Sequence, residues 1–208
     1  NFPEFREKFH VVYNILSAQF LRKMAEAPVD FGDRYSGSRV LSIARLSVQK
    51  GLDLALPAVA SLREKGLEFR WYIIGVGPEE AALQEQARSL GIEQDVCFLG
   101  EQANPYPFLR ACDVYLQPSR FEGKSIAVDE AMVLCKPILL TDFSTAADQV
   151  TSGENGLIVP MTPEGIAEGL EKLLTDGELR QRFRDALEAE DYTNENEIQK
   201  VYSLIGSE

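Results

Sequence analysis

Short hydrophobic runs alternate along this chain with stretches in which hydrophobic residues recur every three or four positions. The runs predict β-strands and the periodic stretches predict amphipathic helices. The expected strands are 9–15, 39–44, 69–74, 95–99, 113–117, 137–141 and 156–159. The expected helices are 50–65, 78–90, 105–111, 125–134, 144–149, 163–175, 178–189 and 194–205. This alternation is typical of βα units around a parallel sheet.

The predicted fold is therefore an α/β fold, a Rossmann-like doubly wound parallel sheet, because crossovers between parallel strands are right-handed. We expect residues 9–190 to form this domain and residues 191–208 to add a C-terminal helix. Only residues 16–38 look like an irregular linker.

Turn residues support the helix boundaries. Gly66 and Gly91 each follow a helical stretch and suit a left-handed C-terminal cap. Thr162 precedes Pro163 and is the expected N-cap of the next helix. Pro57 predicts a kink within helix 50–65.

The net charge of −12 over 208 residues argues against a nucleic-acid-binding surface. A bound phosphate must therefore be held locally, by a few cations and backbone N–H groups. The three cysteines, Cys97, Cys112 and Cys135, have neither a disulfide nor a metal-binding spacing, and they fit a reducing compartment. We find no signal peptide and no apolar run of transmembrane length, so we expect a cytoplasmic protein.

The most informative stretch is 118–137, where Glu122 and Glu130 stand eight positions apart. Glu130 falls within an otherwise apolar helix, on the same face as Ile126 and Leu134. A carboxylate in such surroundings is costly unless a partner donates hydrogen bonds to it. This pattern predicts a polyol or another polar ligand across the start of the helix.

Three further segments lie where ligands bind in parallel sheets, beyond the carboxyl ends of strands. Arg45 and Lys50 follow strand 39–44 and could hold a diphosphate; the alternative is a pair of solvated surface cations. Gly75 follows strand 69–74 and permits close backbone approach to a ligand, or only a tight turn. Residues 123–126 begin a helix whose N–H groups suit an anion, unless Ser125 merely caps it.

The sequence also argues against several other kinds of active site. His10 is the only histidine and falls in an expected strand, so we expect it to be structural. One histidine cannot form a histidine metal cluster, and we find no Ser-His-Asp arrangement. No G-x-G-x-x-G fingerprint follows a strand, which argues against a dinucleotide-binding oxidoreductase. We expect no cofactor and no metal.

Taken together, these segments resemble the C-terminal, donor-binding domain of retaining GT-B glycosyltransferases of family four, also called glycosyl transferases group 1. The resemblance rests on residues 44–51, 75–78, 98–100 and 118–123, and on the Glu122/Glu130 pair with Lys136-Pro137 after it. These elements span most of residues 39–160 in the right order. The loop sequences look like those of capsular and exopolysaccharide transferases.

The resemblance implies roles for particular residues. Arg45 and Lys50 would hold the donor diphosphate, Glu130 would accept hydrogen bonds from the ribose, and Glu122 would contact the donor sugar. Glu122, Arg45 and Lys50 are the residues that it implies to be catalytic. The full set of implied donor-binding residues is Arg45, Lys50, Gly75, Gly100, Gln102, Glu122, Gly123, Lys124, Ser125, Ile126 and Glu130.

Two positions depart from the pattern of the family. Ala44 replaces its usual glycine, which would tighten the approach to the phosphates. Lys124-Ser125 replaces its common aromatic-glycine pair, so the sugar pocket is expected to differ. Nothing in the chain resembles the N-terminal half of a GT-B enzyme, of which residues 1–8 would be a tail. We therefore expect the chain alone to bind donor weakly and to transfer nothing.

The expected function is donor binding in a retaining, metal-independent, UDP-sugar-dependent glycosyltransferase of bacterial cell-surface polysaccharide synthesis. Its expected partners are the nucleotide-sugar and its own N-terminal domain, and peripheral contact with the inner membrane face through that domain is left open. A nucleotide-sugar epimerase of the same fold is one alternative. A non-catalytic binding module, or one subunit of a split transferase, is the other.

Overall fold

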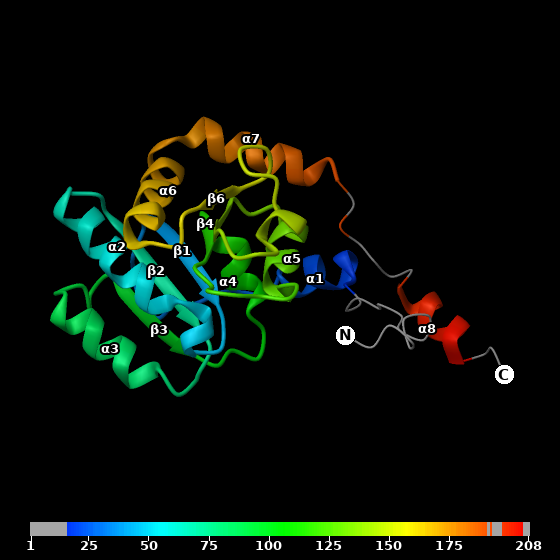
Figure 1. Cartoon of the computed structure of the whole chain (residues 1–208), viewed down its shortest axis with the longest axis horizontal. Helices are drawn as coiled ribbons and strands as arrows, with labels where there is room; N and C mark the ends of the chain where they lie inside the picture. The colour runs from blue at the N-terminus through cyan, green and yellow to red at the C-terminus, as the bar shows by residue number, and fades with distance from the viewer. Residues whose placement is uncertain (1–15, 191, 193–196, 206–208) are drawn as a thin grey trace.

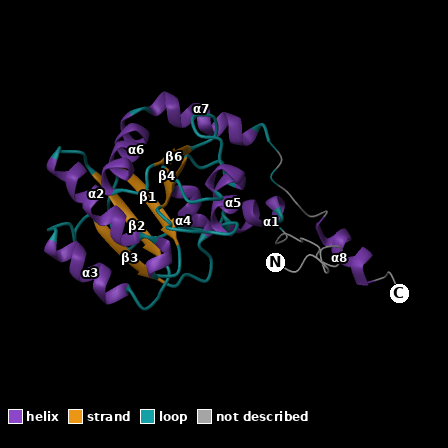
Figure 2. Ribbon diagram, in the orientation of Figure 1, coloured by secondary structure: helices purple, strands orange, loops and turns teal. Residues whose placement is uncertain are grey.

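The computed structural model describes residues 16–190, 192 and 197–205. Six strands form one parallel sheet in the order β3-β2-β1-β4-β5-β6. They are β1 (Ser38–Ile43), β2 (Phe69–Ile74), β3 (Val96–Gly100), β4 (Val114–Gln117), β5 (Ile138–Thr141) and β6 (Leu157–Val159). Helices cover both faces of the sheet (Figures 1 and 2), which confirms the Rossmann-like α/β fold. The predicted strand 9–15 lies outside the described residues.

The helices are α1 (Ala18–Met24), α2 (Leu52–Glu64), α3 (Glu80–Ser89), α4 (Tyr106–Ala111), α5 (Ile126–Val133), α6 (Pro163–Thr175), α7 (Gly177–Glu188) and α8 (Glu197–Ile205). Helix α1 corrects the prediction that residues 16–38 are irregular throughout. Its seven residues are too few for a periodic pattern, and only Leu21 among them is buried. The expected helix 144–149 is reduced to a 3₁₀ turn over Ala146–Asp148.

The strands are hydrophobic because both of their faces are covered. On β2, Trp71 and Ile73 pack with α2, α3 and α6, whereas Tyr72 and Ile74 pack with α4 and α5. Alternate residues of a strand point to opposite faces of its sheet, so a central strand in a two-sided core reads as a nearly continuous apolar run. This burial explains why the strands were recognisable from the sequence.

Several predicted turn features are present. Gly66 and Gly91 have positive φ of 82° and 68°, and the side chain of Thr162 accepts a hydrogen bond from the N–H of Gly165. Helix α2 continues through Pro57 from Leu52 to Glu64.

Proline lacks the N–H that would bond the carbonyl four residues before it, which for Pro57 is the carbonyl of Asp53. That carbonyl accepts a hydrogen bond from Nε2 of Gln86 instead, at 3.0 Å.

The order of the strands fixes where a ligand can bind. From β1, the strands β2 and β3 are added in succession toward one edge of the sheet. From β4, the strands β5 and β6 are added toward the other edge. The direction of winding therefore reverses between β1 and β4, which are hydrogen-bonded neighbours. Loops leaving the carboxyl ends of these two strands diverge and leave a crevice at that point.

Candidate functional site

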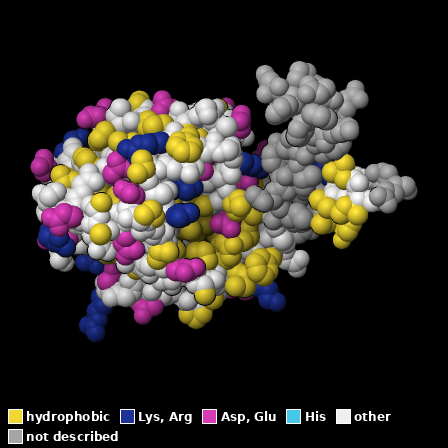
Figure 3. Space-filling view, turned by 60° about the horizontal axis from the view of Figure 1, so that its bottom comes forward, with side chains coloured by type: hydrophobic (Ala, Val, Ile, Leu, Met, Phe, Trp, Pro, Cys, Tyr) yellow, Lys and Arg dark blue, Asp and Glu magenta, His cyan; other side chains and the backbone are white. Residues whose placement is uncertain are grey.

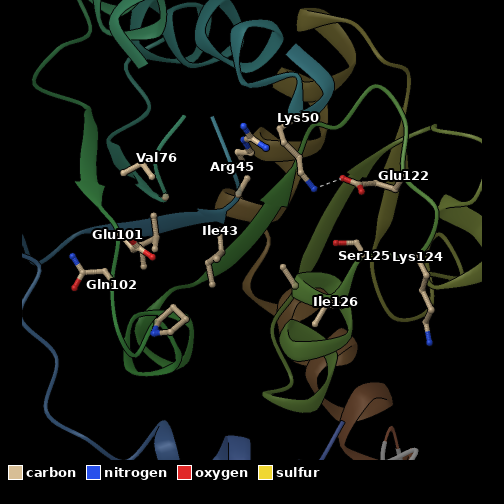
Figure 4. Close-up of a pocket in the computed structure, with 15 residues that line it drawn as sticks. Ile43, Arg45, Lys50, Val76, Glu101, Gln102, Glu122, Lys124, Ser125 and Ile126 are labelled. Carbon is tan, nitrogen blue, oxygen red and sulfur yellow. Dashed lines mark hydrogen bonds and ion pairs between the residues drawn. The ribbon is translucent and has the colours of Figure 1, made fainter. Parts of the chain in front are cut away.

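A cavity of about 630 Å³ lies at this reversal point, between the carboxyl ends of β1 and β2 and the start of α5 (Figure 4). Eight of the eleven predicted donor-binding residues line it: Arg45, Lys50, Gly75, Gln102, Glu122, Lys124, Ser125 and Ile126. Gly100, Gly123 and Glu130 do not. Gly123 instead lines a neighbouring cavity of about 280 Å³, together with Lys124, Asp148 and Gln149.

Lys50 and Glu122, which both line the cavity, form an ion pair. The Nζ of Lys50 lies 2.7 Å from Oε1 of Glu122 (Figure 4), and Ser119 Oγ and Gln117 Nε2 donate to the same oxygen at 2.6 and 3.1 Å. The Glu122 side chain is only 7% exposed. Three donors on one oxygen fix the carboxylate in one orientation, and its Oε2 accepts no hydrogen bond from the described residues.

The loops that carry Lys50 and Glu122 are joined by a second set of contacts. Arg120 donates from both terminal nitrogens to the two carboxylate oxygens of Asp53, each at 2.7 Å. Its backbone N–H donates to the carbonyl of Gln49 at 2.8 Å. The hydrogen bond from Arg120 also lowers the pKa of Asp53, so this contact is present at neutral pH. The position of Lys50 relative to Glu122 is therefore set before any ligand arrives.

Arg45 differs from Lys50 in having no partner. Its side chain is exposed at the lining of the cavity, and it forms no hydrogen bond or ion pair within the described residues. The two predicted diphosphate-binding cations thus line the same cavity, one already paired with a carboxylate and the other available (Figure 4).

The start of α5 combines a cap with unused donors. Ser125 Oγ accepts from the N–H of Val128 at 3.4 Å, and the N–H of Ser125 donates to Oε1 of Gln149 at 2.9 Å. A helix leaves its first N–H groups without partners inside the helix. Those of Ile126 and Ala127 remain, and both residues line the cavity. Ser125 therefore caps the helix while two N–H donors stay available to an anion.

Gly75 and Gly123 of the predicted site differ in whether the surrounding backbone requires a glycine. Gly75 has φ +134°, and a Cβ at this position would lie 1.9 Å from the carbonyl oxygen of Ala44. Its N–H donates to the carbonyl of Gly100 at 2.8 Å. Gly75 thus allows the ends of neighbouring strands to approach each other. At Gly123 a Cβ would meet nothing within 4 Å.

Glu130 lies one helical turn beyond Ile126, which is 45% exposed because it faces the cavity. Burial raises the pKa of the half-buried Glu130 above its usual value. A hydrogen bond from the hydroxyl of Tyr106 to its Oε1, at 2.8 Å, offsets part of this rise. The predicted hydrogen-bond partner of this carboxylate is thus supplied, in part, by the protein itself.

Sequence reasoning missed Gln117, which is 3% exposed at the end of β4. Its Oε1 accepts hydrogen bonds from Tyr115 at 3.0 Å and from Ser125 at 2.9 Å, and its Nε2 donates to Glu122. A polar residue that ends an otherwise apolar strand was the available signal. Gln117 links the buried sheet to the carboxylate in the cavity.

Replacing Gln117 with leucine should lower the free energy of unfolding by about 3 kcal/mol, because two buried hydroxyls lose their acceptor and Glu122 loses a donor. Urea denaturation of wild type and variant measures this difference. Gln84→Leu on the exposed face of α3 is the matched control and should change stability by no more than about 0.5 kcal/mol. Equal stabilities of the Gln117 variant and the wild type would contradict the assignment.

Among the described residues, no group of three His, Cys, Asp or Glu side chains could hold a metal ion. None of the described helices is both long enough and apolar enough to cross a membrane. Acidic side chains are scattered over the face shown in Figure 3, whereas hydrophobic side chains gather on part of it.

Comparison with known proteins identifies the family. The family model for glycosyl transferases group 1 matches residues 33–189. The chain belongs to this family. The match confirms the family that the motifs indicated, and the order of the strands confirms the expected fold.

Two relatives of this group 1 chain illustrate the family. An alpha-D-kanosaminyltransferase from Streptomyces kanamyceticus is 27% identical over 86% of this chain and 48% of its own length. The lipopolysaccharide core biosynthesis glycosyltransferase LpsE from Rhizobium meliloti is 32% identical over 70% of this chain and 42% of its own length. The chain thus spans about half the length of the curated relatives it matches.

The fold also matches solved structures. HepE from Anabaena, described in complex with UDP-glucose, superposes with a TM-score of 0.80 over 96% of this chain and 57% of HepE. The two are 21% identical, so this likeness concerns the fold.

Proposed function

We propose that this chain binds the nucleotide-sugar donor of a retaining, metal-independent glycosyltransferase. The donor is a UDP-sugar, and the enzyme acts in bacterial cell-surface polysaccharide synthesis. One observation carries the proposal: a single cavity at the β1/β4 reversal brings together Arg45, the Lys50–Glu122 pair and the start of α5. The UDP-glucose complex of HepE and the lipopolysaccharide role in the name of LpsE support the choice of donor and process.

The diphosphate binds to Arg45, Lys50 and the N–H groups of Ile126 and Ala127. As the bond between sugar and phosphate breaks, negative charge builds on the departing diphosphate, and these preorganised donors stabilise it without a metal. Lys50 can donate hydrogen bonds to the phosphate and to Glu122 at the same time. An ammonium group has three N–H donors, and the contact with Glu122 uses one of them.

Glu122 binds the donor sugar. Its Oε1 is held by three donors, which leaves Oε2 to accept a hydrogen bond from a sugar hydroxyl. The base lies against residues 100–102, and the ribose lies over α5, where Glu130 accepts its hydroxyls. Membership of the group 1 family favours a transferase over the nucleotide-sugar epimerase.

Titration of the 208-residue chain with UDP, GDP and ADP, followed by NMR and calorimetry, tests this function. UDP should bind saturably in the presence of EDTA, with the largest amide shifts in residues 45–50 and 122–130. Tighter binding of GDP or ADP at the same residues would show that the donor carries a different base, and it would leave the assigned site unchanged. Absence of binding by all three nucleotides, or shifts confined to other residues, would rule the proposal out.

A further inference from the structure

The contact between Tyr106 and Glu130 connects the cavity to the packing of α1. Tyr106 is the first residue of α4 and follows Pro105, which lines the cavity. Its ring packs against an apolar cluster that includes Leu21 of α1 and Val133 of α5. Its hydroxyl donates to Oε1 of Glu130 at 2.8 Å. The ring is held from one side by apolar packing and the hydroxyl from the other by a carboxylate.

The hydrogen bond from Tyr106 restricts the orientation of the Glu130 carboxylate. The last torsion of a glutamate side chain is broad, so its two oxygens have no sharply preferred direction without a partner. Tyr106 supplies that partner through a charge-assisted hydrogen bond, which is stronger than one between neutral groups. Oε2 of Glu130 accepts no hydrogen bond from the described residues, so it is the oxygen left to accept one from a ligand.

The neighbours of Glu130 do not provide a substitute. Asp129, the preceding residue, carries a like charge, and its carboxylate is paired with Lys124 at 3.1 Å. The buried hydroxyl of Tyr115 donates to Gln117. Among the described residues, Tyr106 is therefore the side chain that donates a hydrogen bond to the Glu130 carboxylate.

From this geometry we infer that Tyr106 is a positioning residue: it fixes Glu130 so that Oε2 meets the ribose hydroxyls of the nucleotide. The inference rests on the proposed function. It predicts that discrimination between ribose and deoxyribose at this site depends on a hydroxyl group that touches no part of the ligand. An acceptor rejects a ligand lacking the matching hydroxyl only when the acceptor is fixed in direction and is left unpaired.

The test compares binding of UDP, 2′-deoxy-UDP and 3′-deoxy-UDP to the 208-residue chain and to its Tyr106→Phe variant. The wild type should bind at least one deoxy analogue about tenfold more weakly than UDP, the effect expected of one hydrogen bond to a charged group. In Tyr106→Phe, which keeps the ring in its apolar cluster, that ratio should fall to about two. Tyr202→Phe, at an exposed position on α8, is the matched control and should keep the wild-type ratio.

Two further variants separate positioning from a general loss of structure. Glu130→Gln should reduce the discrimination by itself, and adding Tyr106→Phe to it should reduce the ratio no further, because both changes act on one contact. A purely structural role of Tyr106 would lower affinity for UDP and both analogues equally and leave the ratio unchanged.

The outcomes distinguish this inference from the function on which it rests. If the wild type binds UDP but does not discriminate against either analogue, the assignment of ribose to Glu130 is wrong and the inference falls with it. If the wild type discriminates and Tyr106→Phe discriminates equally well, the inference alone is overturned. Independent, additive effects of the two substitutions would also overturn it.

Discussion

Replacing Arg45 with glutamine should weaken UDP binding by about tenfold or more, while the free energy of unfolding stays within about 0.5 kcal/mol of the wild type. The Arg45 side chain is exposed at the cavity and forms no hydrogen bond or ion pair with the described residues that the substitution could remove. Calorimetric titration measures the affinity, and urea denaturation measures the stability. A pure binding defect of this kind is the mark of a side chain reserved for a ligand.

Lys50→Gln is the matched comparison, because it removes the other cation of the same cavity. It should weaken UDP binding by a similar factor and should also destabilise the fold by about 2 kcal/mol. Breaking a buried ion pair costs more, about 3–5 kcal/mol, but Lys50 is 21% exposed and Glu122 keeps the donors Ser119 and Gln117. The pair of variants therefore separates binding from folding.

Uridine is the control ligand that tests whether the two cations act on the phosphates, since it has the base and the ribose but no phosphate. Its affinity should be unchanged in Arg45→Gln and in Lys50→Gln. Wild-type affinity for UDP in the Arg45 variant would remove Arg45 from the site. Equal losses for uridine and UDP would instead indicate that the substitution disturbs the base or the ribose.

Much of this arrangement was predictable because the sequence records burial directly. A strand that is covered on both faces is apolar over most of its length, so 69–74 and 137–141 were recognisable without any structure. Once the strands are known, right-handed crossovers bring Arg45 and Glu122 to the same edge of the sheet.

Contacts between side chains far apart in the chain were not predictable. Lys50 and Glu122 were expected to act on phosphate and sugar separately, yet they form an ion pair across 72 positions of sequence. Likewise, the composition of α5 showed that Glu130 needs a hydrogen-bond donor, but not that Tyr106 supplies it. Periodicity reveals which face of an element a residue occupies; it carries no information on which neighbouring element presents the partner.

Gly75 shows the same limit at the level of the backbone, and it supports a second prediction of large effect. From the sequence, a glycine after a strand could serve a bound ligand or only a turn. In the structure the close approach is to the chain itself, because a Cβ would lie 1.9 Å from the carbonyl oxygen of Ala44. A φ of +134° at this position also lies in a region that residues with side chains rarely adopt.

Gly75→Ala should therefore lower the free energy of unfolding by about 3–5 kcal/mol, the sum of backbone strain and a clash that no side-chain rotation relieves. Gly123→Ala is the control within the same site: a Cβ there has open space, and stability should change by no more than about 0.5 kcal/mol. Urea denaturation of both variants gives the two values. If Gly75→Ala were as stable as the wild type but no longer bound UDP, the glycine would be needed by the ligand and not by the sheet. The distance between Gly75 and Ala44 favours the opposite result, in which the fold is less stable and the folded molecules bind UDP normally.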